Sequence, residues 1–154
     1  MIRWFLALII ALFVGFLFYV DLNNDRPENL GVTDGLLMPC PASPNCVSSQ
    51  ALESDEMHYV ESIIYKQSAL ETQLLLEQYF LNQGDARIVS SELGYFYVEI
   101  KSSFFGYIDD VELYWPEADS VFHIRSASRV GYSDMNVNRD RVLKMKEYLS
   151  TFEK

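Results

Sequence analysis

An uninterrupted apolar run near the N-terminus constrains this chain more than any other feature. Residues 4–20 are WFLALIIALFVGFLFYV, and every position except Gly15 is apolar. As a helix, this run would extend about 25 Å, close to the ~30 Å hydrocarbon thickness of a bilayer. Trp4 and Tyr19 stand at its two ends, where amphipathic rings anchor at membrane interfaces. The run therefore predicts a transmembrane helix over residues 1–20.

A cleaved signal peptide is the alternative for the same run. Such a peptide has an apolar stretch of about 7–15 residues, followed by a cleavage site of small residues. Here the stretch is longer and ends in Phe18, Tyr19 and Val20, which are too bulky for that site. Cys40 lies too far downstream to be the lipid-bearing cysteine of a lipoprotein. We expect residues 1–20 to be kept as a signal anchor.

The charges that flank the run predict its orientation. Arg3 precedes it, while Asp21 and Asp25 follow it, and Arg26 weakens the contrast. Because positive charge is retained on the cytoplasmic side, we expect a cytoplasmic N-terminus and an extracytoplasmic remainder. In a bacterium, this describes a single-pass protein of the inner membrane with its C-terminal domain in the periplasm or at the cell exterior.

The chain has two cysteines, Cys40 and Cys46. Outside the cytoplasm such a pair usually forms a disulfide, and closing this short loop would stabilise the fold by roughly 2 kcal/mol. A thiol-disulfide enzyme is the alternative, although such enzymes prefer Cys-X-X-Cys at a helix start. A zinc site would need two more ligands, and His58 and His123 lack the spacing of a zinc finger. We predict a structural disulfide, no metal and no cofactor.

The remainder of the chain divides into a linker and one domain. Residues 21–39 mix Asn, Asp, Pro and Gly without periodicity, which is typical of a linker. Residues 40–154 suffice for a single domain. Its first segment, 58–65, predicts a strand, and the capping box Ser68-Ala-Leu-Glu71 begins a helix that should end at Gly84. We expect the buried stripe of this helix to be Leu70, Leu74, Leu75, Phe80 and Leu81.

Four strand-like segments and a second helix follow. The strands are predicted at 86–91, 95–101, 107–115 and 121–127. The helix is predicted over 138–152, and its buried face should hold Val142, Met145, Leu149 and Phe152. The order of elements in the domain is β-α-β-β-β-β-α. Short turns between successive strands predict an antiparallel sheet packed against two helices, and hence an α+β fold.

Side-chain type predicts the register of the last hairpin. From Val111 onward the odd-numbered positions of segment 107–115 are apolar, whereas the even-numbered ones carry carboxyl and hydroxyl groups. A register that pairs Trp115 with Phe122 keeps apolar against apolar on both strands. It also places Glu112 opposite Arg125, with Asp110 close by, and such a pair contributes roughly 0.2–1 kcal/mol.

Charge is distributed unevenly along the chain. Residues 21–124 hold four basic and eighteen acidic residues, a net of −14, whereas residues 125–146 hold six basic and two acidic, a net of +4. The acidic excess disfavours nucleic acid as a partner. In the basic segment, serine hydroxyls, arginines and the amides at a helix start predict a site for a carboxylate or phosphate. Alternatively, the arginines pair with Asp109, Asp110 and Glu112.

The residues singled out for binding come from the acidic strand and from this basic segment. They are Asp109, Asp110, Glu112, Arg125, Ser126, Ser128, Arg129, Ser133, Asp134, Asn138 and Arg139.

Three blocks of the sequence resemble one protein family. They are CPASPNCVSSQ at 40–50, FGYIDDVE at 105–112, and IRSASRVGYSD at 124–134 followed by VNR. Their residues and their order resemble the motifs of the family catalogued as domain of unknown function 1499, over about residues 38–152. Asn136 departs from the glycine usual in that family, although asparagine also tolerates left-handed backbone. The family implies no established activity, but the resemblance suggests that the three blocks converge in space.

Two classes of function are compatible with these features. The first is a non-catalytic binding or assembly module tethered to the membrane, whose partner is an unknown protein or an anionic small molecule. The second is an enzyme, using thiol-disulfide chemistry at the cysteines or acid–base chemistry at Asp109, Asp110 and His123. Adjacent strand residues point to opposite faces, which separates the two aspartates. Since no nucleophile elbow, P-loop or HExxH motif occurs, we favour the binding module.

Overall fold

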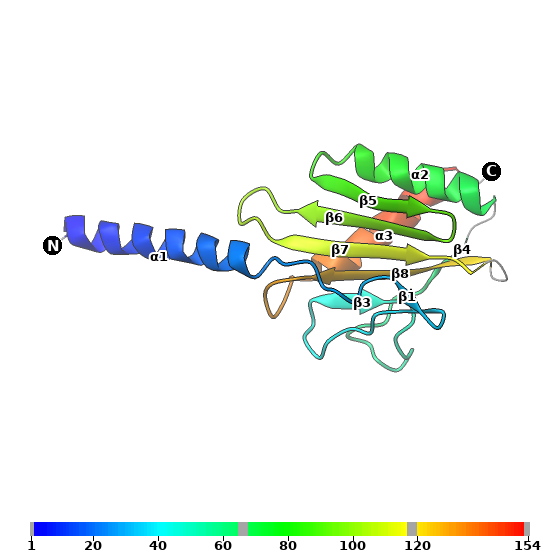
Figure 1. Ribbon diagram of the computed structural model, residues 1–154, viewed down its shortest axis with the longest axis horizontal. Coiled ribbons are helices and arrows are strands. Elements are labelled where there is room, and N and C mark those ends of the chain that lie inside the picture. Colours follow the sequence, from blue (N-terminus) through cyan, green and yellow to red (C-terminus); the bar gives the residue numbers. More distant parts are fainter. Residues whose placement is uncertain (1, 65–67, 117–119, 153–154) are drawn as a thin grey trace.

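A long N-terminal helix leads into a domain built from a main sheet and two further helices (Figure 1). The computed structural model describes residues 2–64, 68–116 and 120–152. The N-terminal helix, α1 (Ile2–Leu22), has 21 residues and is long and apolar enough to cross a membrane. Within it, Val20 alone is buried by the protein. The other apolar side chains of α1 are therefore available to contact lipid.

Over the residues that the structure describes, the main sheet has six strands, and its strands pair with one another antiparallel. Its order is β3-β8-β7-β6-β5, and β4 pairs with an earlier part of β8. The strands are β3 (Cys46–Ser48), β4 (Ile63–Ile64), β5 (Ala86–Glu92), β6 (Tyr95–Lys101), β7 (Ile108–Tyr114) and β8 (Val121–Ser128). Gly94 and Gly106 supply the positive φ angles that the turns beside β6 require. The predicted α+β fold is confirmed.

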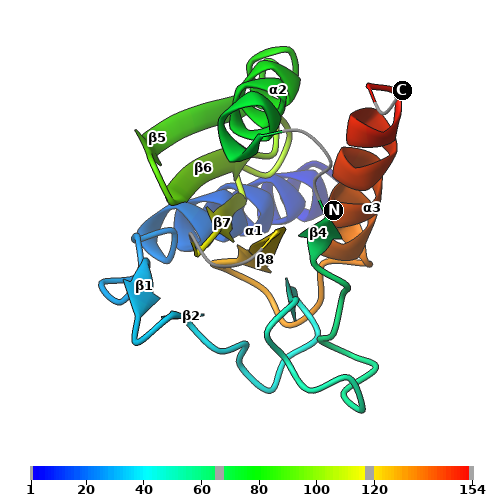
Figure 2. The same ribbon diagram turned by 90° about the vertical axis from the view of Figure 1, so that its right-hand side faces the viewer.

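Two helices cover one face of the sheet, and the hydrophobic core lies beneath them (Figure 2). They are α2 (Ala69–Leu81) and α3 (Val137–Ser150). α2 begins with the predicted capping box, in which Ser68 and Glu71 each accept a hydrogen bond from the other's backbone N–H. The largest fully buried side chains of the core are Phe80, Phe96, Phe122, Leu76, Leu113, Ile124 and Met145.

The two faces of the sheet differ in chemistry because side chains alternate along each strand. The face toward the helices carries the apolar residues of β6, β7 and β8. The opposite face, here called the polar face, carries Tyr95, Tyr97, Glu99, Asp110, Glu112, Arg125 and Arg129. Glu112 lies opposite Arg125, and the rings of Trp115 and Phe122 are 4.6 Å apart between centroids, as the register predicted. The hairpin register is therefore confirmed.

The segment between α1 and the cysteine loop lies over the polar face, opposite α2 and α3 (Figure 2). It includes a small antiparallel pair, β1 (Val32–Thr33) and β2 (Leu36–Leu37), which the sequence did not predict. The amide of Gly31 donates to Glu112 Oε1 at 2.7 Å, and that of Leu37 donates to Gln50 Oε1 at 2.8 Å. This N-terminal segment, residues 23–40, is therefore attached to the domain at Gly31 and Leu37.

Four local predictions are wrong. Of segment 58–65, only Ile63–Ile64 forms a strand within the described residues, because Asp55 and His58 hold the chain before it in a turn. α2 ends at Leu81, before the predicted Gly84. In α2 the buried residues are Thr72, Gln73, Leu76 and Phe80, whereas Leu70, Leu74 and Leu81 are exposed. Phe152, expected on the buried face of the last helix, lies beyond α3 and is 42% exposed.

Two leucines of α2 test which side of this helix is buried. Leu76 is 1% exposed and Leu74 is 54% exposed. Leu76→Ala should lower the free energy of unfolding by about 2–5 kcal/mol because it opens a cavity in the core. Leu74→Ala, the matched control, should change it by less than about 0.5 kcal/mol. Denaturant unfolding of the detergent-solubilised full chain, followed by circular dichroism, measures both; equal losses would contradict the packing of α2.

Candidate functional site

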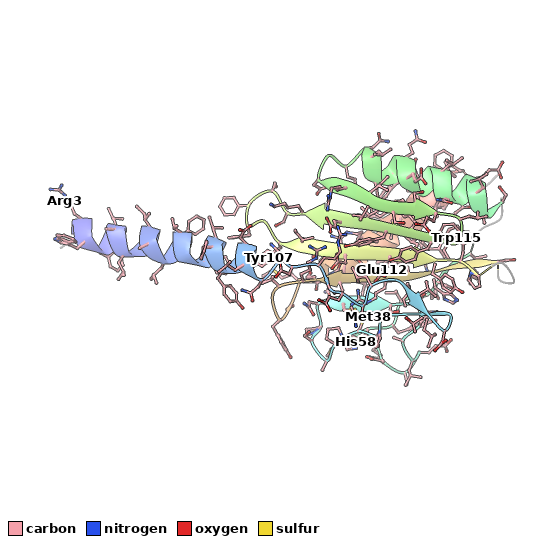
Figure 3. All side chains as sticks on the ribbon, in the orientation of Figure 1. Arg3, Met38, His58, Tyr107, Glu112 and Trp115 are labelled. Atoms are coloured by element: carbon pink, nitrogen blue, oxygen red, sulfur yellow. A yellow bond between two sulfur atoms is a disulfide. The ribbon has the colours of Figure 1, made fainter. Side chains whose placement is uncertain are left out.

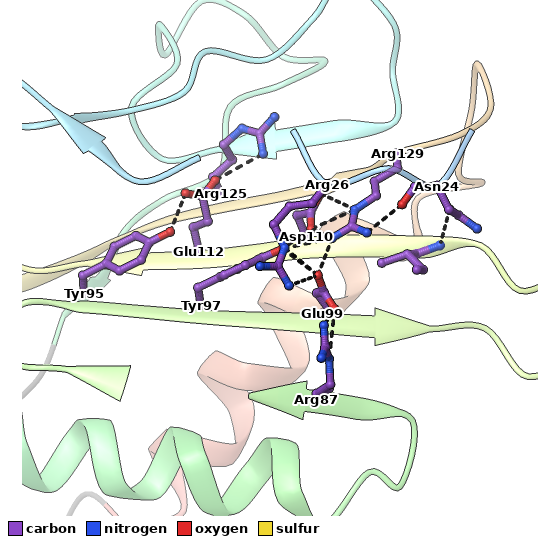
Figure 4. A network of polar contacts seen from close by, with 11 residues as sticks. Asn24, Arg26, Arg87, Tyr95, Tyr97, Glu99, Asp110, Glu112, Arg125 and Arg129 are labelled. Carbon is purple, nitrogen blue, oxygen red and sulfur yellow. Dashed lines mark hydrogen bonds and ion pairs between the residues drawn. The ribbon is translucent and has the colours of Figure 1, made fainter. Parts of the chain in front are cut away.

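Arg129 is the centre of an ion-pair network on the polar face (Figure 4). Its side chain is 5% exposed, and its Nη2 lies 2.6 Å from both Asp110 Oδ1 and Glu99 Oε1. Nη2 also donates to the hydroxyl of Tyr97, and Nη1 donates to the carbonyl of Asn24 at 2.8 Å. One guanidinium thus joins β6, β7, the end of β8 and the exit from α1. Burial disfavours the charged guanidinium, but the charge-assisted hydrogen bonds to Asp110 and Glu99 outweigh that effect and raise the pKa of Arg129.

The carboxylate of Glu99 accepts hydrogen bonds from three arginines. Besides Arg129, Arg26 Nη2 donates to its Oε1 at 2.7 Å, and Arg87 Nη2 approaches its Oε2 at 2.5 Å. Burial disfavours the ionised carboxylate, but the hydrogen bonds from the three guanidinium groups outweigh that effect and lower the pKa of Glu99 to about 2. Arg26 also lies over the ring of Tyr97, 5.4 Å from its centroid. Among the described residues, every buried polar side-chain atom in this part of the network has a hydrogen-bond partner.

The second pair on this face, Glu112 with Arg125, is different. The two side chains are 0% and 3% exposed, and Arg125 Nη1 lies 3.3 Å from Glu112 Oε2. Glu112 Oε1 accepts from Tyr95 and from the amide of Gly31. Among the described residues, the buried Nε of Arg125 has no hydrogen-bond partner. Burial raises the pKa of Glu112 and lowers that of Arg125. The attraction between the two charges therefore does not fully offset the hydration that both groups lose on burial.

A cavity of about 440 Å³ lies beside Arg125, between the polar face and the N-terminal segment. Arg125, Ser128, Arg129 and Asp110 contribute to its wall from the sheet side, and Asn29 from the N-terminal segment. Because the acceptors of Arg129 are all supplied by the protein, the guanidinium of Arg125 has the larger unused donor capacity here. Asp110, Arg125, Ser128 and Arg129 belong to the binding set predicted from the sequence.

A neighbouring cavity of about 490 Å³ contains an aspartate–histidine pair that the sequence analysis did not single out. Asp55 Oδ2 lies 2.8 Å from His58 Nδ1, and Ser48 lines the same space. The arrangement lacks the geometry of a catalytic triad, because His58 Nε2 faces the carbonyl of Ser43 at 3.2 Å. The hydroxyl of Ser48 instead accepts from the amide of Gln50. His58 here fastens the cysteine loop to the turn at Asp55.

The opposite side of β7 holds a separate ion pair. Asp109 faces α3, where Arg141 Nη2 lies 2.6 Å from its Oδ2. Arg141 also donates to the hydroxyl of Ser126, which in turn donates to Asn138 Oδ1 at 2.6 Å. Asn138 is 0% exposed, so the polar groups of this cluster are enclosed by the packing of α3 on β8. Asp109 and Asp110 therefore lie on opposite faces of the sheet, as strand alternation predicted.

The start of α3, predicted as an anion site, is occupied by a carboxylate of the chain itself. Asp134 accepts hydrogen bonds from the amides of Asn138 and Asn136, at 2.7 and 3.1 Å. The hydroxyl of Ser133 accepts from the amide of Met135. Arg139 donates to three backbone carbonyls in the turn at residues 56–59. Since these amides and the guanidinium of Arg139 already have acceptors within the chain, an anion could bind here only by displacing those acceptors.

His123, the predicted base of an acid–base enzyme, lies apart from both aspartates. It pairs in register with Tyr114 at the far end of the β7–β8 hairpin, and its ring stacks on Tyr114. Its Nδ1 lies 3.5 Å from the hydroxyl of Ser49, which accepts a hydrogen bond from the amide of Ile124. The structure therefore does not bring together the three residues that the enzymatic alternative requires.

The cysteine loop is closed by a disulfide between Cys40 and Cys46. Inside the loop, Asn45 Nδ2 donates to the carbonyls of Ser128 and Gly131, at 3.1 and 2.8 Å. Cys46 itself pairs with Ala127 in the sheet. The loop is thereby attached to the end of β8, next to Arg129 and Asp110. The three sequence blocks do converge in space.

Several members of the network were missed by the sequence analysis, namely Asn24, Arg26, Arg87, Tyr95, Tyr97 and Glu99. The signal for three of them was present, since Tyr95, Tyr97 and Glu99 alternate with apolar residues along β6. Among the described residues, no group of three or more His, Cys, Asp or Glu side chains is placed to hold a metal ion.

Fold and site together define an α+β domain with a buried ion-pair network, joined to a helix of membrane-spanning length. The model of one family, described as Protein of unknown function (DUF1499), matches residues 36–149. The chain belongs to this family, which confirms the resemblance noted from its three sequence blocks. No curated protein and no solved structure was found to match the chain.

The pKa of Glu99 predicts how stability depends on pH. Because it is lowered from 4.5 to about 2, the network stabilises the fold fully above about pH 4.5 and loses this contribution as the pH falls toward 2. Glu99→Gln should therefore be less stable at pH 7 and should lose stability less steeply between pH 5 and pH 2. Urea unfolding of the full chain in detergent at a series of pH values measures the slope.

Glu92→Gln is the matched control for this measurement, because Glu92 is exposed on the neighbouring strand. It should keep the wild-type slope. A Glu99→Gln variant with the wild-type slope would mean that Glu99 does not contribute to the acid sensitivity of the fold.

Proposed function

We propose that this protein is a membrane-anchored, extracytoplasmic domain that binds an anionic ligand without transforming it. The observation that carries the proposal is Arg125, which lines a cavity of about 440 Å³ and whose buried Nε has no hydrogen-bond partner among the described residues. A buried cation with too few acceptors gains free energy when an anion supplies them. A carboxylate or phosphate group suits the fork of an arginine.

The membrane placement is supported by α1 and by the disulfide. α1 has a length of about 31 Å at 1.5 Å per residue, which matches the hydrocarbon core of a bilayer. Disulfides persist in oxidising compartments outside the cytoplasm. Arg3 before the run and Asp21 after it fit an N-terminus that stays in the cytoplasm. In a bacterium the domain would then lie in the periplasm, attached to the inner membrane.

A binding role fits the polar face better than catalysis does. Arg129, Glu99 and Asp110 hold one another in fixed positions through several short contacts each. His58 and His123, the two histidines of the chain, lie outside this cavity. Such an arrangement orients a ligand, whereas acid–base catalysis needs a group that is poised to exchange a proton with the substrate.

The anion site can be tested by ligand-dependent stabilisation. With chloride replaced by inorganic phosphate or acetate at constant ionic strength, the melting temperature of the full chain in detergent should rise saturably, since the anion binds only the folded state. Asn29→Asp, a nearly isosteric change in the cavity wall, should abolish the rise by repelling the anion. Arg125→Gln should abolish it as well.

Arg87→Gln is the control, because Arg87 belongs to the same face but its side chain is 69% exposed and lies away from the cavity. It should retain the full anion effect. If neither anion stabilises the wild-type protein, or if Asn29→Asp keeps the effect, the proposed site is wrong. The Asn29→Asp result also decides the matter should Arg125→Gln fail to fold.

The predicted orientation has an independent test in a bacterial host. The chain is expressed with an epitope tag at each end, and intact spheroplasts are treated with an added protease. The C-terminal tag should be lost, because it lies outside the cytoplasm, while the N-terminal tag should survive until the membrane is lysed. Survival of the C-terminal tag in intact spheroplasts, with its loss after lysis, would reverse the predicted orientation.

A further inference from the structure

The loop between β6 and β7 lies at the end of the domain nearest α1 (Figure 1) and contains two exposed phenylalanines. Phe104 is 73% exposed and Phe105 is 40% exposed. The two rings are in edge-to-face contact with each other, 4.7 Å apart between centroids. Two large apolar rings exposed at the tip of one loop are typical of an interaction surface.

The same loop lies alongside α1. Phe104 approaches Phe13 of α1 at 6.3 Å between ring centroids, and Phe105 approaches Phe16 at 5.9 Å. Tyr107, which Figure 3 shows beside the end of α1, approaches Phe16 at 6.4 Å. The exposed rings are therefore continuous with the surface of a helix whose own apolar side chains face outward.

The contacts with α1 fix the depth of the loop. Phe13 and Phe16 precede Leu22, the last residue of α1, by nine and six residues. At 1.5 Å per residue, they lie about 13 Å and about 9 Å along the helix from its end. If α1 fills the ~30 Å hydrocarbon core of a bilayer, both positions fall within the leaflet on the domain's side.

At the base of the loop, backbone polar groups have partners within the protein, as a segment that enters a bilayer requires. The amide of Gly106 donates to the carbonyl of Ser102 at 3.1 Å, and the amide of Ser102 donates to the carbonyl of Tyr107 at 2.8 Å. Asn24, just after α1, donates through Nδ2 to the carbonyl of Gly106 and accepts through Oδ1 from the amide of Ile108. The loop is thus closed on itself and attached to the exit of α1.

We propose that the Phe104–Phe105 loop is a second membrane contact, which inserts both rings into the leaflet beside α1. The occupant of this aromatic surface is the lipid bilayer itself. The insertion holds the domain upright on the membrane, since α1 and the loop contact the bilayer together and Asn24 joins them. This inference rests on the membrane placement proposed above and is independent of anion binding.

Tryptophan reporters in the full chain test the insertion. Phe104→Trp and Phe105→Trp are made separately in a Trp4→Phe background and reconstituted in phosphatidylcholine vesicles with or without brominated acyl chains, which quench tryptophan emission at short range. We expect each reporter to be quenched by the brominated lipid, with emission shifted to shorter wavelength. Trp115 is 4% exposed and contributes a constant background.

Leu93→Trp is the matched control, because Leu93 is 78% exposed in the β5–β6 turn at the other end of the sheet. It should not be quenched. The wild-type chain supplies a second control, since comparison with Trp4→Phe reports whether Trp4, and hence α1, is in the bilayer. Quenching of Trp4 with neither loop reporter quenched above the Leu93→Trp level would overturn the loop proposal alone. Absence of Trp4 quenching would overturn the membrane placement as well.

Discussion

The buried guanidinium of Arg129 holds together parts of the chain that are distant in sequence. It binds Asp110 on β7, Glu99 and Tyr97 on β6, and the carbonyl of Asn24 after α1. Burying a guanidinium is costly unless each of its donors finds an acceptor. Here all three nitrogens do, and the acceptors come from three separate segments. The N-terminal segment consequently has a defined position over the polar face, and the cavity beside Arg125 exists because this cover is in place.

Asn24 extends the same connection to the end of the domain nearest α1. Its carbonyl accepts from Arg129, while its side chain bonds to Gly106 and Ile108 at the base of the β6–β7 loop. α1, the aromatic loop and the ion-pair network are therefore linked through one residue. The cavity beside Arg125 and the aromatic loop are thereby held in a fixed relation to each other and to the end of α1.

The sequence predicts the register of β7 correctly, but not the buried side of α2 or the role of Glu99 on β6. The register of β7 and β8 could be predicted, because only one alignment keeps Leu113 beside Ile124 and Glu112 beside Arg125. The buried stripe of α2 could not, because its leucines surround the helix and Leu74 satisfies the same pattern as Leu76. β6 was placed correctly, yet the role of Glu99 was missed, since its partners Arg26, Arg87 and Arg129 are far apart in the chain.

Features that depend on neighbouring residues could be predicted from the amino-acid sequence. These are the apolar run of α1, the short cysteine loop, the capping box of α2 and the strand alternation that makes an α+β domain. Tertiary structure decided which carboxylate meets which arginine. Asp109 and Asp110 are adjacent in sequence, but one pairs with Arg141 beneath α3 and the other with Arg129 under the N-terminal segment. The physical reason is that alternation and capping are local, whereas the pairing of a buried charge depends on which distant segment covers it.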